Sequence, residues 1–222
     1  MNWDSIVQRL STRLSEELPG KEAQREMASN LRDPYFPIPK DYRESAVLAL
    51  LYPHLENKLH IVFMKRTQDG RAHGGQISFP GGRIEESDRD TIYTALREAK
   101  EELSVPSDKV KVLGTMTEMY IPVSNFMVYP VVGFLTERPD FVPQPDEVDE
   151  IIEIQLDTFF DDSIRQMYNV QVRPQLYLNA PSFKINGNVI WGATAMMMNE
   201  LIHVLRAVPE LAQIGIQAGQ ND

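Results

Sequence analysis

The stretch FPGGRIEESDRDTIYTALREAKEELSV, residues 79–105, joins a Pro-Gly-Gly turn to a short acidic loop and then to a helical pattern. At about 100° per residue its apolar positions fall on one narrow face, the spacing of a helix that packs on a core. These positions are Ile92, Ala95, Leu96, Ala99 and Leu103. Glu98, Glu101 and Glu102 fall together on roughly the opposite side of the same helix.

Three carboxylates on one side of a helix repel one another unless a positive charge lies among them. One interpretation is a solvated acidic face, because most runs of charge are of that kind. The Gly81-Gly82 turn upstream favours another interpretation, in which the chain folds back and the carbonyl of Gly82 joins the carboxylates. Hard oxygen ligands of this kind suit Mg²⁺ or Mn²⁺.

The run from Gly82 to Glu102 resembles the box of the Nudix pyrophosphohydrolases, whose pattern is G-x5-E-x7-R-E-U-x-E-E-x-G-U. The resemblance implies that Glu98, Glu101 and Glu102, together with the carbonyl of Gly82, hold a divalent metal and serve catalysis. By our interpretation, Arg97 is the inner ion-pair partner that holds these glutamates in place and takes no direct part in catalysis.

Two departures from the pattern affect the loop and the end of the helix. One additional residue separates Gly82 from Arg97, so that the pattern's first Glu, counted back from Arg97, falls on Arg89. The acidic residues that can replace this Glu are Glu85, Glu86 and Asp88. Ser104 stands where the pattern has Gly, at a helix C-cap where Ser is the poorer left-handed residue.

A second pattern precedes the box and is rich in arginine and glycine. It consists of Arg66, Arg71, Gly75 and Phe79, which are separated from one another by four, three and three residues, with His73 between Arg71 and Gly75. The guanidinium fork pairs with phosphate oxygens, and glycines let backbone N–H groups approach them. A solvated basic loop is the alternative for this segment taken by itself.

This spacing resembles the signature of the coenzyme A pyrophosphatase subfamily, L-L-T-x-R-S-x3-R-x3-G-x3-F-P-G-G, with residues 62–66 varying its opening and Thr67 replacing Ser. The resemblance implies hydrolysis of coenzyme A or acyl-coenzyme A to 3′,5′-ADP and 4′-phosphopantetheine or its acyl derivative. Arg66, Arg71, His73 and Gly75 are the expected substrate-binding residues.

Composition bounds the partners of the protein. The net charge of −10 over 222 residues argues against a nucleic-acid partner, because phosphate backbones need clustered Lys and Arg. No run approaches the ~20 apolar residues of a membrane span. Residues 1–20 lack the layout of a signal peptide and the chain has no cysteine, so we expect a cytoplasmic protein. A small nucleotide is the expected ligand, and a homodimer is a possible assembly.

The remaining chain alternates between strand and helix patterns. Helices are expected at residues 3–17, around 21–31 and from 192 to 207. Apolar or alternating runs bounded by turn residues predict strands at 45–52, 59–66, 109–121, 126–136 and 150–155. We also expect a short helix to start at 157–162, and a hairpin-like pair, 175–179 and 183–190, around Ala180-Pro181.

The fold expected from this order and from the resemblance is an α/β/α sandwich with a mixed β-sheet and an N-terminal helical extension. We divide the chain into an extension and connector at residues 1–40 and a Nudix hydrolase domain at residues 41–222. The acidic loop at 140–149 brings Glu147 and, just after it, Glu150 as possible further carboxylates. The base that activates water is therefore Glu98, Glu101 or Glu147.

Two rival functions are left open by the sequence. One is a Nudix hydrolase for another nucleoside diphosphate compound, such as ADP-ribose or NADH; the loop from Arg66 to Gly75 counts against it. The other is a non-catalytic nucleotide-binding domain that regulates a partner. Such a domain is expected to lose box glutamates, yet Glu98, Glu101 and Glu102 are all present.

Overall fold

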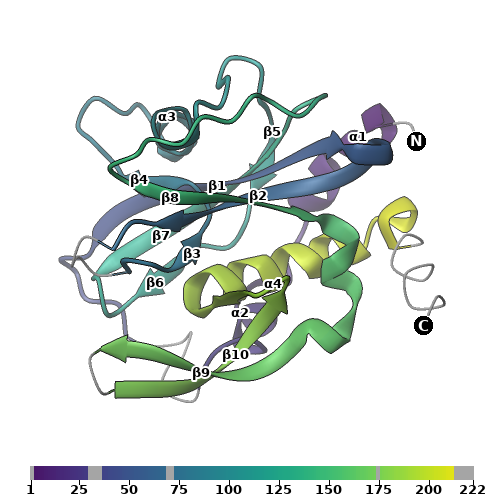
Figure 1. Cartoon of the computed structure of the whole chain (residues 1–222). Coiled ribbons are helices and arrows are strands. Elements are labelled where there is room, and N and C mark those ends of the chain that lie inside the picture. Colours follow the sequence, from purple (N-terminus) through teal and green to yellow (C-terminus); the bar gives the residue numbers. More distant parts are fainter. Residues whose placement is uncertain (1–2, 30–36, 69–72, 174–175, 213–222) are drawn as a thin grey trace.

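A long antiparallel strand pair runs through the centre of the protein (Figure 1). In this computed structural model, which describes residues 3–29, 37–68, 73–173 and 176–212, strand β1 (Arg43–His54) pairs with β2 (Lys58–Arg66). On its other side β1 runs parallel to β7 (Phe126–Phe134). The pairing of β1 in both directions makes the sheet mixed, as the sequence predicts.

Short strands complete this sheet around the central three. They are β3 (Ile77–Ser78), β4 (Gly81–Arg83), β5 (Lys111–Thr115), β6 (Met119–Ile121) and β8 (Val148–Gln155). The order along the main path is β3-β2-β1-β7-β5, with β4 beside β1, β6 beside β7 and β8 beside β2. This sheet therefore has eight strands among the described residues. The expected strands at 45–52, 59–66, 126–136 and 150–155 are confirmed, and the run at 109–121 divides into β5 and β6.

Helix α3 (Thr91–Leu103) covers one face of this sheet and lies above it in Figure 1. Leu48 and Leu50 of β1 point to this face and form a core cluster with Ala95 and Ala99 of α3. Ala49 and Leu51, which alternate with them along β1, belong to the cluster on the opposite face, because successive strand side chains point to opposite faces. Each fully buried Leu of this kind stabilises the fold by about 1.5–3 kcal/mol.

The other helices lie on the opposite face and complete the α/β/α sandwich. They are α1 (Trp3–Leu14), α2 (Gly20–Arg25) and α4 (Gly192–Arg206). The methionine run at residues 196–198 of α4 is buried core, as expected, and Leu10 of α1 belongs to the same cluster. The division between residues 1–40 and residues 41–222 stays a prediction. Among the described residues, no helix has the length and apolar character needed to cross a membrane.

The C-terminal part corrects the expected hairpin. Strand β10 (Leu176–Ile185) runs straight through Ala180-Pro181 and pairs with β9 (Arg165–Arg173), a strand the sequence analysis missed. The turn falls at Asn186-Gly187, both with positive φ, and leads into β11 (Asn188–Trp191). Short 3-10 helices complete the described elements at Leu55–Asn57, Leu156–Phe160 and Asp162–Ile164.

Candidate metal and catalytic site

Helix α3 is fixed at both ends by local backbone chemistry. Asp90 caps its first turn, where its carboxylate accepts a hydrogen bond of 2.7 Å from the backbone N–H of Tyr93. Ser104 ends the helix in the left-handed conformation, with φ 58°, at the place where the family pattern has Gly. These two caps therefore fix where the last two turns of α3, which carry the box glutamates, lie against the sheet.

The two glycines of strand β4 let the turn approach the sheet and the helix closely. A Cβ atom on Gly81 would collide with the backbone of Val47 in β1. A Cβ atom on Gly82 would overlap the carboxylate of Glu98. Both positions therefore require glycine for close approach, and Gly82 lies directly against one of the predicted metal-binding carboxylates.

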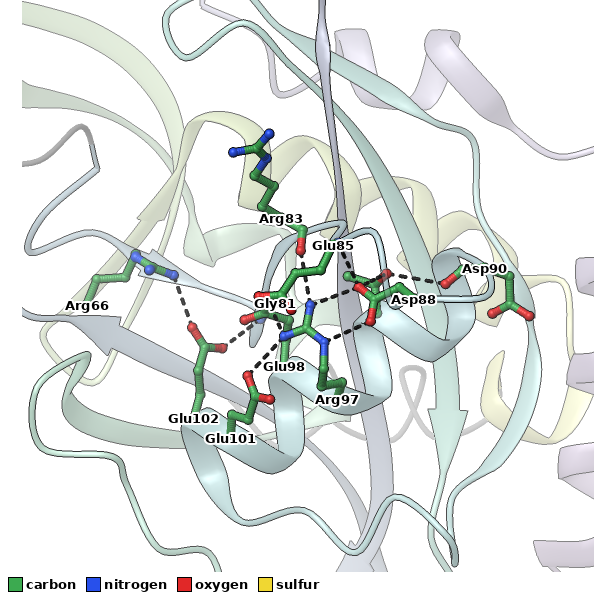
Figure 2. Close-up of polar contacts among 11 residues, drawn as sticks. Arg66, Gly81, Arg83, Glu85, Asp88, Asp90, Arg97, Glu98, Glu101 and Glu102 are labelled. Carbon is green, nitrogen blue, oxygen red and sulfur yellow. Dashed lines mark hydrogen bonds and ion pairs between the residues drawn. The ribbon is translucent and has the colours of Figure 1, made fainter.

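Glu102 is a buried carboxylate, with 1% of its surface exposed. It accepts a hydrogen bond of 2.7 Å from the backbone N–H of Gly81 and forms an ion pair of 3.4 Å with Arg66 (Figure 2). Burial raises the pKa of the Glu102 carboxyl, whereas the charge of Arg66 and the hydrogen bond from Gly81 favour the ionised form. The sequence analysis did not identify the Gly81 N–H as a partner of Glu102, although the Pro-Gly-Gly turn indicates that the backbone approaches closely there.

Arg97 supplies the positive charge expected among the other glutamates. Its guanidinium forms ion pairs of 3.0 Å with Glu98 and 2.9 Å with Glu101. The Glu98 carboxylate is mostly buried, and burial raises the pKa of that group despite the neighbouring Arg97. The Glu101 side chain, by contrast, is 57% exposed. The three glutamates therefore stand in different environments, with Glu101 outermost.

Asp88 fills the place of the first Glu of the family pattern. Figure 2 shows the Arg97 side chain directed at Asp88, whose two oxygens each accept a hydrogen bond of 2.9 Å. These hydrogen bonds hold the pKa of the Asp88 carboxyl far below its usual range. Arg97 also donates to the carbonyl of Arg83 at 3.1 Å. The choice that the sequence left between Glu85, Glu86 and Asp88 thus falls on Asp88.

The donors present fit a divalent cation in type. Glu98, Glu102 and the adjoining Gly82 are oxygen donors, and burial leaves the two carboxylates in need of positive charge. As the side chains stand, Arg66 and Arg97 provide that charge, and no three acidic or imidazole side chains of the described residues are grouped as a ready-made metal site.

The glycine-containing loop after β2 lies beside this carboxylate site. Arg66 closes it through two backbone hydrogen bonds of 3.0 Å, to the carbonyl of Gln76 and from the N–H of Gly75. His73 faces Gln76, with 3.1 Å between its Nδ1 and Oε1 of Gln76. Arg71 lies outside the described residues. The structure thus brings Arg66 to helix α3 and places His73 and Gly75 in the adjoining turn.

Glu147 approaches from the loop before β8. Its charge raises the pKa of both Glu98 and Glu102, and its carbonyl accepts a hydrogen bond of 3.1 Å from the Thr67 N–H. The same loop is tied to α3, because the N–H of Gln144 donates to the carbonyl of Glu102 at 2.8 Å. Of the two carboxylates considered in this region, Glu147 is therefore the one near the site.

Glu150 does not join the carboxylates of α3. It pairs with Lys65 in the β2–β8 register, whereas the next pair, Met64 and Ile151, packs on the α3 face. Directly paired residues share a sheet face and successive residues alternate. Glu150 is therefore directed to the other face, which excludes it from the site.

Comparisons with known proteins agree on one family. Residues 43–167 match the NUDIX domain. The chain is 36% identical over 164 residues to the "Uncharacterized Nudix hydrolase NudL" of Pectobacterium atrosepticum, covering 72% of this chain and 81% of the relative. It is 32% identical over 158 residues to "Nudix hydrolase 15, mitochondrial" of Arabidopsis thaliana, covering 69% of this chain and 55% of that relative.

A solved structure supports the fold alone. The crystal structure of a Nudix hydrolase from M. smegmatis, RenU, superposes with a TM-score of 0.53 at 18% identity, covering 82% of this chain and 95% of that one. The matched residues 43–167 include β4, α3 and the carboxylates just described. The chain therefore belongs to the Nudix family of hydrolases.

Proposed function

We propose that this protein hydrolyses the diphosphate bond of coenzyme A or acyl-coenzyme A in a reaction that depends on Mg²⁺ or Mn²⁺. The products are 3′,5′-ADP and 4′-phosphopantetheine or its acyl derivative. One observation carries the proposal: Arg66, which begins the phosphate-binding pattern, contacts Glu102 of the metal-binding helix at 3.4 Å. The two motifs that resemble the coenzyme A subfamily therefore meet at one place.

Glu98 and Glu102, with Glu101 and the carbonyl of Gly82, would hold the cation. Once bound, Mg²⁺ or Mn²⁺ neutralises the diphosphate oxygens and orients a water molecule, which is the usual contribution of these ions to phosphoryl transfer. Arg97 keeps Glu98 and Glu101 in position and is itself braced by Asp88. The protein thus supplies a rigid helix end on which the acidic oxygens are arranged before the substrate arrives.

A protein carboxylate would accept the proton of the attacking water. The candidates remain Glu98, Glu101 and Glu147. Of these three, Glu147 is the best placed to act as the base. Its carboxylate has no ion-pair partner among the described residues, and its charge acts on both Glu98 and Glu102. Glu101 is less suited, because its carboxylate is held by Arg97 on the exposed side of the helix.

The substrate loop supplies cations for the phosphates of the ligand. Coenzyme A carries a 3′-phosphate that dephospho-coenzyme A, ADP-ribose and NADH lack, and Arg66, Arg71 and His73 are the candidates to bind it. A charged contact left unpaired costs about 1.5–3 kcal/mol, or roughly tenfold to a hundredfold in selectivity. We therefore expect coenzyme A to be preferred over ligands without the 3′-phosphate.

The test compares turnover of coenzyme A, dephospho-coenzyme A, ADP-ribose and NADH with Mg²⁺ and with Mn²⁺. Coenzyme A should give the highest kcat/KM, and Arg71→Ala should reduce it for coenzyme A more than for dephospho-coenzyme A. Equal losses on both would mean that the loop binds the shared diphosphate. A higher kcat/KM on ADP-ribose or NADH would favour the rival hydrolase, and nucleotide binding without turnover of any compound would favour the regulatory domain.

The cytoplasmic location and the homodimer stay predictions from the sequence. Light scattering of the purified protein tests the second: a mass near twice the 25.4 kDa of the chain supports a dimer, and a mass of one chain contradicts it.

A further inference from the structure

The two arginines that face the carboxylates of α3 are held very differently. Arg97 is 15% exposed and donates to both oxygens of Asp88 and to the carbonyl of Arg83, besides its ion pairs with neighbouring glutamates. The side chain of Arg66 is 30% exposed and, among the described residues, its guanidinium has one polar contact, to Glu102. Arg97 is therefore built into the site, and Arg66 is attached to it at one point.

The single contact of Arg66 is long for a charged pair. Its Nη1 lies 3.4 Å from Oε1 of Glu102, whereas charge-assisted N–H···O bonds are usually about 2.7–2.9 Å. The backbone of Arg66, in contrast, is fixed by hydrogen bonds to Gln76 and from Gly75. The guanidinium can therefore turn about a fixed Cα without disturbing the strand.

Glu102 is where a divalent cation and Arg66 would compete. Its carboxylate is buried and already accepts from the N–H of Gly81 through Oε2, so Oε1 is the oxygen that Arg66 faces. A cation at this carboxylate would place two like charges a few ångströms apart in a poorly solvated site. The loosely held charge, that of Arg66, is the one that can leave.

We propose that Arg66 is an exchangeable counter-ion: it neutralises Glu102 until a divalent cation binds, and then turns to a phosphate oxygen of the nucleotide. This inference rests on the proposed function and adds a coupling to it. Cation binding releases Arg66 for the phosphate, and phosphate binding keeps Arg66 away from Glu102. Each ligand therefore strengthens the binding of the other, by equal factors because such coupling is reciprocal.

The experiment measures Mn²⁺ binding without nucleotide, by electron paramagnetic resonance of free Mn²⁺, for the wild type and Arg66→Gln. Removal of the competing charge should tighten Mn²⁺ binding severalfold. With Mn²⁺ saturating, the same variant should bind α,β-methylene-ADP, a diphosphate that cannot be hydrolysed at its bridge, severalfold more weakly if Arg66 turns to the diphosphate. It should bind 3′,5′-ADP severalfold more weakly if Arg66 turns to the 3′-phosphate, and unchanged binding of both would overturn the exchange. Arg66→Lys keeps the charge and should remain near the wild type in Mn²⁺ affinity, which also tests whether substitution at this position preserves the fold.

Arg138→Gln is the matched control, because Arg138 pairs with Glu153 at 2.7 Å away from the site. It should leave both affinities unchanged. Unchanged or weaker Mn²⁺ binding in Arg66→Gln would overturn the exchange, because Arg66 would then only orient Glu102 or only bind substrate. Glu102→Gln distinguishes a failure of the proposed metal site from a failure of the exchange alone. If it leaves wild-type Mn²⁺ affinity unchanged, the proposed metal site fails; if it weakens binding while Arg66→Gln has no effect, only the exchange fails.

Discussion

Asp88 and Arg97 form a bidentate ion pair, in which Nε and Nη2 of the arginine each lie 2.9 Å from a carboxylate oxygen. This pair indicates where the additional residue of the box lies. Five residues separate Gly82 from Asp88, as in the family pattern, and eight separate Asp88 from Arg97. Relative to the family pattern, the additional residue therefore lies between Asp88 and Arg97.

Replacement of Asp88 by Asn should destabilise the protein and reduce its activity. The amide keeps one acceptor oxygen but turns a donor towards Arg97, so that a buried charged hydrogen bond is lost. The expected cost is about 1–3 kcal/mol in the free energy of unfolding. Activity should fall because Arg97 no longer holds Glu98 and Glu101 in one place. Chemical denaturation and steady-state kinetics measure the two effects.

Glu86→Gln is the control for this prediction, because Glu86 is exposed in the same acidic loop. It should leave stability and turnover near the wild-type values. If Asp88→Asn behaved like Glu86→Gln, the ion pair with Arg97 would not be what braces the box.

Glu102→Gln should lose activity by orders of magnitude and keep its thermal stability or gain some. The substitution preserves shape but removes a buried negative charge that Arg66 neutralises through one long contact. Burial of a neutral group costs less free energy than burial of a charged one, so the metal-free variant should lose little stability. Thermal unfolding without metal and turnover with saturating Mg²⁺ provide the measurements. Near-normal turnover would remove Glu102 from the proposed machinery.

Gly82→Ala should impair catalysis while the fold remains. The new methyl group would overlap the Glu98 carboxylate and push it aside, but Gly82 does not have a positive φ that would strain alanine. Gly187→Ala is the opposite case: nothing lies near its Cβ position, and its φ of 84° strains the backbone. We expect kcat to fall in the first variant with a small change in Tm, and Tm to fall in the second with kcat kept. The reverse pattern would argue against close packing of Gly82 on Glu98.

Glu153 should contribute stability that depends on pH. Burial alone would raise the pKa of its carboxyl, but hydrogen bonds from Arg138 and Tyr52 outweigh burial and lower that pKa below its ordinary value. A carboxyl with a lowered folded-state pKa stabilises the protein above its unfolded pKa of about 4.3 and loses this contribution as the pH falls through the folded-state value. The wild type should therefore exceed Glu153→Gln in unfolding free energy at pH 7, by a margin that shrinks towards pH 3.

Chemical denaturation at a series of pH values measures this margin. Glu150→Gln, an exposed position on the same strand, should show no comparable pH-dependent difference from the wild type. A constant margin for Glu153→Gln across the series would mean that ionisation of Glu153 does not contribute.

Periodicity predicted the elements that bury one face, and it failed where turn residues were ambiguous. The apolar runs of β1, β2 and β7 and the narrow face of α3 were readable because each must meet the core. Pro181 suggested a turn, but it lies within β10, opposite Met167 of β9 and one residue before the part that β11 covers. The true turn signal was Asn186-Gly187, a sequence that suits the positive φ of tight hairpins.

The candidate site was predictable in its composition but not in its contacts. Glu98, Glu101 and Glu102 follow from helical spacing, and Arg97 was expected among them. The choice of Asp88 over its acidic neighbours depends on how the loop at residues 83–90 bends, which spacing alone does not fix. The approach of Arg66 to Glu102 depends on the register of β2 and on the β4 turn, and both are set by long-range pairing.

The most direct test of the account is mass spectrometry of the products formed from coenzyme A with Mg²⁺ in ¹⁸O-labelled water. Hydrolysis of the diphosphate predicts 3′,5′-ADP and 4′-phosphopantetheine in equal amounts, with a single ¹⁸O atom in one of them, and predicts no products from the Glu98→Gln variant under the same conditions. Intact coenzyme A with the wild-type protein, or release of inorganic phosphate with the diphosphate bond unbroken, would contradict it.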